Sequence, residues 1–266
     1  MIMKIYLYCI LLTLSATILN AQKEDSSVHR TKLSILVLQY HESLNQIYWL
    51  DKKGEIDKDN SLHSSTSSII APIKYKGPKV ITLCALKQKP NPDGSLYTPI
   101  AKASLPASKN TIIILIPNSK KKKDEKNWFP YRAVSIDDSD KKFTSGSRLV
   151  YNLTNSSIRG ITGTVPMQPR DPKNNRFIIK PGKFTIVKSL SGKTFNQVYL
   201  EQYASTSKEW KRFKSSRWFH MPNKRKFVFI YQKGNTAPKL KIVSQNMLAP
   251  QLLESNRSIP EETSSN

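Results

Sequence analysis

One segment of the chain, Lys208–Tyr231, interleaves cationic and aromatic side chains. It holds eight lysines and arginines against one acid, Glu209, and ends in an apolar run. Cationic groups contact phosphate, sulfate or carboxylate, exposed aromatic faces stack on bases or sugars, and arginine adds bidentate geometry. We therefore predict an anion-binding surface made by Lys211, Arg212, Lys214, Arg217, Trp218, Lys224, Arg225 and Lys226. The alternative is that the aromatic side chains belong to the core and the cations surround its rim.

No catalytic motif accompanies this segment. The chain has no G-x-S-x-G or S-x-x-K sequence, and its histidines are far apart at His29, His41, His63 and His220. Paired carboxylates for glycoside hydrolysis are not favoured either, because the acids between residues 159 and 241 are only Asp171, Glu201 and Glu209. We predict a non-catalytic protein. A hydrolase whose site assembles from distant residues is the alternative.

Metal-binding patterns are equally weak. There is no H-E-x-x-H and no paired C-x-x-C motif. The run Asp137-Asp138-Ser139-Asp140 offers oxygen ligands, but it lacks the glycine and distal glutamate of an EF-hand, and two lysines follow it. We predict a solvated turn there, and neither a metal nor a cofactor.

Cysteine usage points to a fold held by its core. After Ala21 the single cysteine is Cys84, which lies in the β-rich run KVITLCALK. A disulfide-stapled secreted domain needs cysteine pairs. Cys84 is therefore predicted to be a buried, inert thiol.

The elements that position these residues are predicted to be strands. Apolar runs are short, rich in β-branched residues and separated by turn residues, and sixteen prolines disfavour long helices. The predicted strands lie at Lys32–Tyr40, Gln46–Leu50, Ser67–Ile70, Lys79–Leu86, Thr111–Ile116, Tyr131–Ile136, Ser147–Leu153, Ser157–Thr162, Arg176–Ile179, Lys183–Leu190, Phe195–Tyr203, Lys226–Tyr231 and Lys239–Val243.

Local patterns refine this prediction. Gly54 is suited to the positive φ that ends a tight turn, and Pro181-Gly182 fits the centre of a type II turn. Both faces of Lys226–Tyr231 are apolar, which predicts a central strand covered on both sides.

The first 21 residues have the layout of a secretory signal. Lys4 precedes an uncharged run from Ile5 to Leu19, and Ala21 suits the position before cleavage. An uncleaved anchor is the alternative, but the run is short for a span of about 20 residues. We predict export to the periplasm or the exterior.

The predicted domain organisation follows from composition. A lysine run at 119–127 is too charged to be buried and separates two β-sandwich (Ig-like) domains at 28–118 and 128–245. Residues 246–266 are polar and predicted to be a disordered tail. No sequence repeat is visible, although the halves could share a topology.

Charge is the most unusual bulk property. The whole chain carries +24, and the excess is uneven. Residues 22–150 hold 22 basic and 13 acidic side chains, a net +9, whereas residues 151–266 hold 20 and 6, a net +14. A field of this size attracts polyanions and weakens with salt.

A stretch at residues 143–154, FTSGSRLVYNLT, is followed by Gly160, Gly163 and Pro181-Gly182. In this pattern the sequence resembles uncharacterised exported bacterial β-sandwich proteins. The resemblance covers about residues 130–190 and implies a sandwich fold and export, with no activity or site residues to transfer.

Together these patterns predict an exported, non-catalytic protein that binds anionic polymers of the envelope or matrix, such as anionic polysaccharide, through a basic C-terminal domain. The main alternative is a structural or assembly domain that engages another envelope protein. Nucleic acid is not the expected partner of an exported protein, and no transmembrane segment is expected in its mature form.

Overall fold

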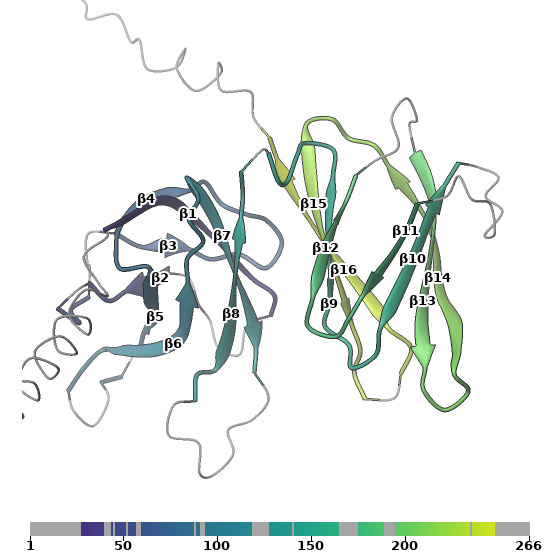
Figure 1. The fold of residues 1–266 in the computed structure, drawn as a ribbon. Helices are drawn as coiled ribbons and strands as arrows, with labels where there is room; N and C mark the ends of the chain where they lie inside the picture. The colour runs from purple at the N-terminus through teal and green to yellow at the C-terminus, as the bar shows by residue number, and fades with distance from the viewer. Residues whose placement is uncertain are drawn as a thin grey trace, which may run out of the picture.

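In a computed structural model the protein is all-β and forms two β-sandwiches of two four-stranded sheets each (Figure 1). The structure describes residues 28–39, 44, 46–51, 53–56, 60–87, 89–90, 94–118, 128–139, 141–164, 175–188, 195–234 and 236–247. The first sandwich contains β1 (His29–Val37), β2 (Gln46–Trp49), β3 (Leu62–His63), β4 (Ile73–Gly77), β5 (Val80–Leu86), β6 (Tyr97–Ser104), β7 (Asn110–Pro117) and β8 (Tyr131–Asp137). The second contains β9 (Arg148–Asn152), β10 (Ile158–Gly163), β11 (Asn175–Ile179), β12 (Phe184–Val187), β13 (Phe195–Ala204), β14 (Glu209–Phe219), β15 (Lys224–Tyr231) and β16 (Lys239–Asn246). Within the described ranges, no helix has the length and apolar character needed to cross a bilayer.

The second sandwich repeats the topology of the first, strand by strand. The sheets of the first have the orders β4-β1-β7-β8 and β3-β2-β5-β6, and those of the second have the orders β12-β9-β15-β16 and β11-β10-β13-β14. Adding eight to each strand number of the first sandwich gives the second. Pairing directions repeat as well, because β1 is parallel to β7 as β9 is to β15, and the corresponding remaining pairs are antiparallel. The halves therefore share a topology without a sequence repeat.

A β-bulge lies at the same place in both sandwiches. The register of β5 and β6 shifts between Leu83 and Cys84 and leaves Ile100 unpaired. The register of β13 and β14 shifts between Leu200 and Glu201 and leaves Phe213 unpaired. Both bulged side chains pack on the core of their own sandwich. This match aligns the two outer sheets residue by residue.

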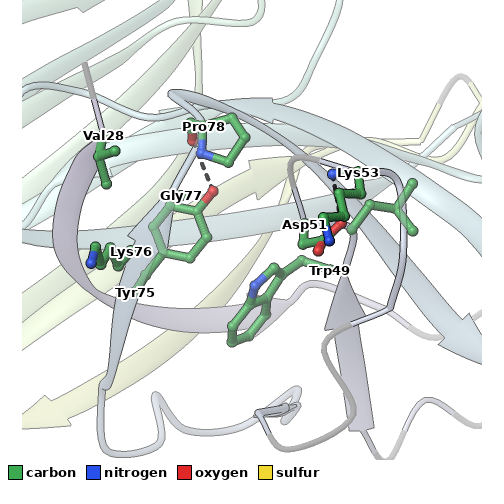
Figure 2. A pocket seen from close by; sticks show the side chains of 9 residues that line it. Val28, Trp49, Asp51, Lys53, Tyr75, Lys76, Gly77 and Pro78 are labelled. Carbon is green, nitrogen blue, oxygen red and sulfur yellow. Dashed lines mark hydrogen bonds between the residues drawn. The ribbon is translucent and has the colours of Figure 1, made fainter. Parts of the chain in front are cut away.

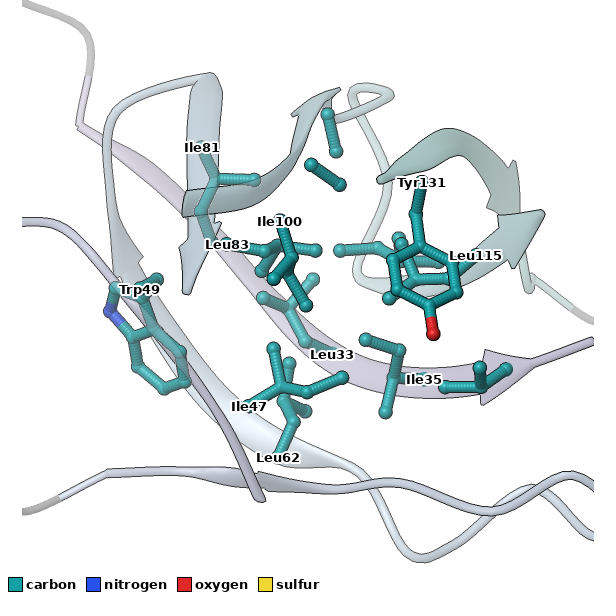
Figure 3. Packing of buried hydrophobic residues seen from close by; sticks show 14 of the residues in the cluster. Leu33, Ile35, Ile47, Trp49, Leu62, Ile81, Leu83, Ile100, Leu115 and Tyr131 are labelled. Carbon is teal, nitrogen blue, oxygen red and sulfur yellow. The ribbon is translucent and has the colours of Figure 1, made fainter. Parts of the chain in front are cut away.

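Three apolar layers separate the four sheets. The first layer lies inside the first sandwich, where Leu33, Ile47, Leu83 and Leu115 pack with Trp49 against one another (Figure 3). The third layer lies inside the second sandwich and contains Val150, Val198, Leu200 and Val228, among others. Each layer removes large apolar side chains from water, which is the main favourable contribution to folding.

The middle layer joins the two sandwiches. Ile112 and Ile114 of β7 meet Tyr151, Phe227 and Phe229 of the second sandwich in one buried cluster. Its members come from β1, β7 and β8 on one side and from β9, β15 and β16 on the other, so equivalent sheets face each other. The two sandwiches share a core, and the four sheets pack face to face in succession across the molecule (Figure 1).

Polar contacts surround the middle layer. The ammonium of Lys241 donates to the carbonyl of Leu38 at 2.5 Å, and Ser68 forms a parallel bridge with Ser244. These contacts link residues about 170 to 200 positions apart in sequence. Partial burial of the Lys241 side chain lowers its pKa.

The strand predictions hold for most of the chain and fail at identifiable places. Lys226–Tyr231 is confirmed as a strand covered on both sides, since β15 contributes Phe227 and Phe229 to the middle layer and Val228 and Ile230 to the third. The predicted strand at 67–70 is wrong, because only Ser68 forms an isolated bridge there. The prediction omitted β3, β4, β6 and β14.

The domain boundaries also need correction. The segment Tyr131–Ile136 was placed in the second domain, yet β8 pairs with β7 and completes a sheet of the first sandwich. Asn246, assigned to the tail, is the last residue of β16, and the amide of Met247 donates to the carbonyl of Asn223. The predicted signal at 1–21, the linker at 119–127 and the tail from 248 onward lie outside the described residues.

Both turn predictions are confirmed. Gly54 has φ of 82° and Gly182 has φ of 69°. The amide of Lys183 donates to the carbonyl of Lys180 at 3.1 Å, which closes the predicted Pro181-Gly182 turn.

Cys84 is buried as predicted, and burial raises the pKa of its thiol to about 11. At pH 8 roughly one thiol in a thousand would be ionised at such a pKa, so native Cys84 should react with Ellman's reagent far more slowly than a free cysteine. Absorbance at 412 nm should show no fast phase from Cys84 until denaturant is added. The Cys84→Ser variant is the control, because its absorbance signal comes only from other thiols. A fast native reaction that disappears in Cys84→Ser would contradict the burial.

Candidate functional site

The basic and aromatic segment identified in the sequence forms β14, an edge strand of 11 residues in the sheet β11-β10-β13-β14. Trp218 points into the third apolar layer. Since neighbouring residues of a strand point to opposite faces, Arg217 and Phe219 lie on the outer face of the sheet. The bulge at Phe213 inserts one extra residue and shifts the alternation by one position. Arg212 and Trp210 therefore also face outward.

On this outer face, three arginines stack on three aromatic rings. The guanidinium of Arg212 lies 3.8 Å from the ring centroid of Tyr199, and that of Arg159 lies 4.6 Å from the ring of Trp210. Arg217 lies 5.4 Å from the ring of Phe195. Each stack is worth about 0.5–1 kcal/mol at an exposed site, and it restricts the orientation of the guanidinium plane.

A carboxylate lies between two of the arginines. Glu201 pairs across the sheet with Arg159 on β10 and with Arg212 on β14. Its Oε2 accepts from Nε of Arg159 at 2.8 Å and from Nη2 at 2.6 Å, while its Oε1 lies 3.6 Å from Nη2 of Arg212. The Glu201 side chain is 9% exposed. The row Arg159–Glu201–Arg212 thus carries a net positive charge, and Arg212 keeps most of its donors.

We call the outer-face set Arg159, Phe195, Tyr199, Glu201, Trp210, Arg212 and Arg217 the arginine platform. It is built from β10, β13 and β14, and all its members face away from the third apolar layer. Two exposed apolar side chains lie on the same face at its borders, Ile178 and Phe219.

The equivalent sheet of the first sandwich lacks this row. When the two bulges are aligned, Arg159, Glu201 and Arg212 correspond to Tyr48, Cys84 and Pro99. Tyr48 makes an edge contact with Tyr97 at 5.3 Å, in the place that the Arg159–Trp210 stack occupies in the second sandwich. The same topology therefore forms without the charged row, so the fold alone does not account for it.

The predicted surface residues are not gathered on one face. Arg212 and Arg217 belong to the arginine platform, and Lys211 and Lys214 are exposed neighbours on β14. Trp218 is buried, which contradicts its prediction as a surface residue. The guanidinium of Arg148 lies 5.1 Å from its ring and donates to the carbonyl of Phe219, and burial lowers the pKa of Arg148 to about 10.

Lys224, Arg225 and Lys226 lie on β15, in a different sheet. Arg225 is 2% exposed and its Nη1 lies 2.6 Å from Oδ1 of Asp138 in the first sandwich, so its prediction as a ligand-binding residue is wrong. The pKa of Lys226 is lowered by burial and by the charges of Arg148 and Lys224. The turn at residues 221–223 sends the chain from one sheet to the other, which separates these lysines from the arginine platform.

The predicted set of binding residues missed five members of the platform, Arg159, Phe195, Tyr199, Glu201 and Trp210. A signal was available, because Tyr199, Glu201 and Tyr203 occupy alternate positions of a predicted strand and must share a face. The pairing of that strand with β10 and β14, which brings the arginines to it, is a tertiary feature and has no local signal.

The predicted solvated turn at 137–140 is wrong for its first two residues, and Asp140 lies outside the described residues. Asp138 is buried against Arg225. Burial alone would raise the pKa of Asp137, but hydrogen bonds from Lys142, Ser108 and Ser139 hold it well below its usual range. The described residues contain no cluster of three or more metal-ligating side chains.

A pocket of about 320 Å³ lies at one end of the first sandwich (Figure 2). Trp49 and Tyr75 form its base, with ring centroids 5.7 Å apart, and burial raises the pKa of Tyr75 to about 12. Asp51 is the only acid among its described lining residues, and its Oδ1 already accepts from the amides of Lys53 and Glu55 at 2.8 and 2.9 Å. The Asp51 carboxylate thus serves the local turn.

No protein-family model matches the chain, and no curated protein matches it. Among solved structures it is similar to a protein from Bacteroides ovatus described as a "putative cell adhesion protein". The identity is 8%, the TM-score is 0.25, and the match covers 84% of this chain and 99% of that one.

Proposed function

We propose that this chain is an exported, non-catalytic protein that binds anionic polymers of the envelope or matrix through the arginine platform. The observation that supports the proposal is the row Arg159–Glu201–Arg212 with its aromatic stacks, at a place where the first sandwich has Tyr48, Cys84 and Pro99. A charged surface present in only one of two sandwiches of the same topology supports a role in recognition.

The electrostatics of the second half of the chain support this role. Residues 151–266 carry a net +14, which raises the local concentration of polyanions near the surface. Stacked guanidinium groups then supply charge-assisted hydrogen bonds, which are worth about 1.5–3 kcal/mol each when they are well formed. The long-range field brings the polymer to the surface, and short-range contacts determine how long it stays.

Binding to another envelope protein is a second candidate function. It is favoured by Ile178 and Phe219, which are 61% and 52% exposed at the borders of the arginine platform. Large exposed apolar side chains beside arginine and aromatic groups are common in protein interfaces. The polymer test below also separates this possibility.

The test is retention of the protein on immobilised heparin, lipopolysaccharide and double-stranded DNA across a salt series. We expect retention on heparin or lipopolysaccharide at about 150 mM salt, where the screening length is about 8 Å. The variant Arg159→Gln/Arg212→Gln/Arg217→Gln should bind at least about tenfold more weakly, since it loses several charge-assisted hydrogen bonds.

A matched control removes the same charge from the first sandwich. Lys74, Lys102 and Lys109 are exposed there, and their replacement by glutamine should change retention far less than the arginine variant does. If the two variants lose affinity equally, or if no polymer is retained at that salt, the polymer proposal fails. A protein partner captured through Ile178 and Phe219 would then be the better account.

A further inference from the structure

The three arginines of the platform differ in how their donors are used. Arg159 gives Nε and Nη2 to Glu201. Arg212 is 43% exposed, and its nearest carboxylate oxygen lies 3.6 Å away, beyond hydrogen-bonding distance. Arg217 makes no hydrogen bond or ion pair with the described residues; its recorded contact is the stack on Phe195. Arg212 and Arg217 therefore keep most of their N–H groups available, each beside an aromatic ring.

The rings beneath these two arginines set their spacing. Tyr199 and Phe195 lie on the same face of β13, four positions apart. At about 3.3 Å per residue, the two stacked guanidinium groups are about 13 Å apart along the strand. Both arginines are exposed, so their unpaired N–H groups are open to a ligand from solvent.

We propose that Arg212 and Arg217 bind oxyanion groups of a linear anionic polysaccharide bidentately, and that guanidinium geometry rather than net charge determines the affinity. This inference rests on the proposed function and deepens it. A planar guanidinium matches the two oxygens of a sulfate, phosphate or carboxylate group, whereas an ammonium acts as a point charge. The ligand lies along β13 and β14 and presents anionic groups about 13 Å apart.

The stacks also favour polysaccharide over nucleic acid. Single-stranded nucleic acids gain much of their affinity from bases stacked on open aromatic faces. Here Tyr199 and Phe195 each have a guanidinium over the ring, so these faces are occupied. A polymer bound through its anionic groups suits this surface better than one bound through stacked bases.

The strand itself supplies a control for charge. Lys211 and Lys214 lie beside Arg212 on β14 with their side chains directed to the other face of the sheet, are exposed, and make no cation–π stack with the described aromatic rings. They add to the same field as the arginines without a fixed geometry. Charged side chains on an open edge also discourage strand-to-strand aggregation, which gives these lysines a role of their own.

The experiment measures the affinity of the full chain for heparin, for polygalacturonate and for single-stranded DNA at 150 mM salt by surface plasmon resonance. Arg212→Lys/Arg217→Lys keeps the net charge, whereas Lys211→Gln/Lys214→Gln removes two charges. We expect the first variant to bind the preferred polysaccharide at least about tenfold more weakly, and the second to lose less than about threefold. Circular dichroism and thermal melting should be unchanged for both, since all four side chains are exposed or stacked on the surface.

Heparin and polygalacturonate distinguish sulfate from carboxylate as the bound group. If wild type binds a polysaccharide but the arginine-to-lysine variant binds it equally well, the inference is overturned and the proposed function stands. If single-stranded DNA binds more tightly than both polysaccharides, the assignment of the ligand class is wrong. If wild type binds none of the three, the proposed function itself fails.

Discussion

Replacement of Phe229 by alanine is expected to lower the free energy of unfolding by about 3–5 kcal/mol, the usual cost of deleting a buried phenylalanine ring. Phe229 is fully buried in the middle apolar layer and lies 6.4 Å from the ring of Tyr151. Because this layer is the shared core of both sandwiches, we expect one cooperative transition that shifts as a whole. Chemical denaturation followed by tryptophan fluorescence and by circular dichroism measures it.

The matched control is Ile178→Ala, which also truncates an apolar strand residue but one that is 61% exposed. Surface substitutions of this kind usually change stability by no more than about 0.5 kcal/mol. Two separate transitions, with only one of them shifted by Phe229→Ala, would show that the sandwiches unfold independently and that the middle layer contributes little.

Replacement of Arg225 by alanine is expected to cost about 3–5 kcal/mol, because it leaves the buried carboxylate of Asp138 without its cationic partner. Nη1 of Arg225 lies 2.6 Å from Oδ1 of Asp138, and its guanidinium also lies 5.1 Å from the ring of Phe143. The pair connects β15 of the second sandwich to the segment that follows β8 of the first. Equilibrium unfolding gives the cost directly.

A double-mutant cycle identifies the cause. Replacing both partners with apolar groups, as in Arg225→Met/Asp138→Leu, removes the stranded charge and should recover most of the stability lost by Arg225→Ala. If the double variant is as unstable as the single one, the stranded carboxylate of Asp138 does not account for the loss.

Much of the fold can be predicted from local pattern, because strand formation depends on alternation and β-branched content. β15 is the clearest example: its two apolar faces indicated coverage on both sides, and the structure confirms it. β14 was missed because its outward residues are arginines, aromatics and serine instead of a regular polar series. What pairs with a strand is decided by contacts between distant residues, so neither the strand orders nor the middle layer could be predicted.

The candidate site shows the same limit. Eight residues close in sequence were predicted to form one surface, yet a turn divides them between two sheets. Trp218 and Arg225 are buried and so do not belong to any surface. The residues that complete the arginine platform come from strands that begin about 50 and 15 positions earlier. The density of charge along the chain pointed to β14, but the pairing register between strands determines which side chains meet there.

The repeated topology of the two sandwiches has a consequence for valency. The two halves pack through equivalent faces, as the subunits of an isologous dimer do, so that surface is fully used within one chain. A symmetric dimer of the second half would expose two identical arginine platforms and could hold a long polymer at two points. The fused protein has one, since the corresponding sheet of the first half has Tyr48, Cys84 and Pro99 in that row. Under the proposed function each molecule would be monovalent at this surface, and avidity would come from many copies bound along the same polymer.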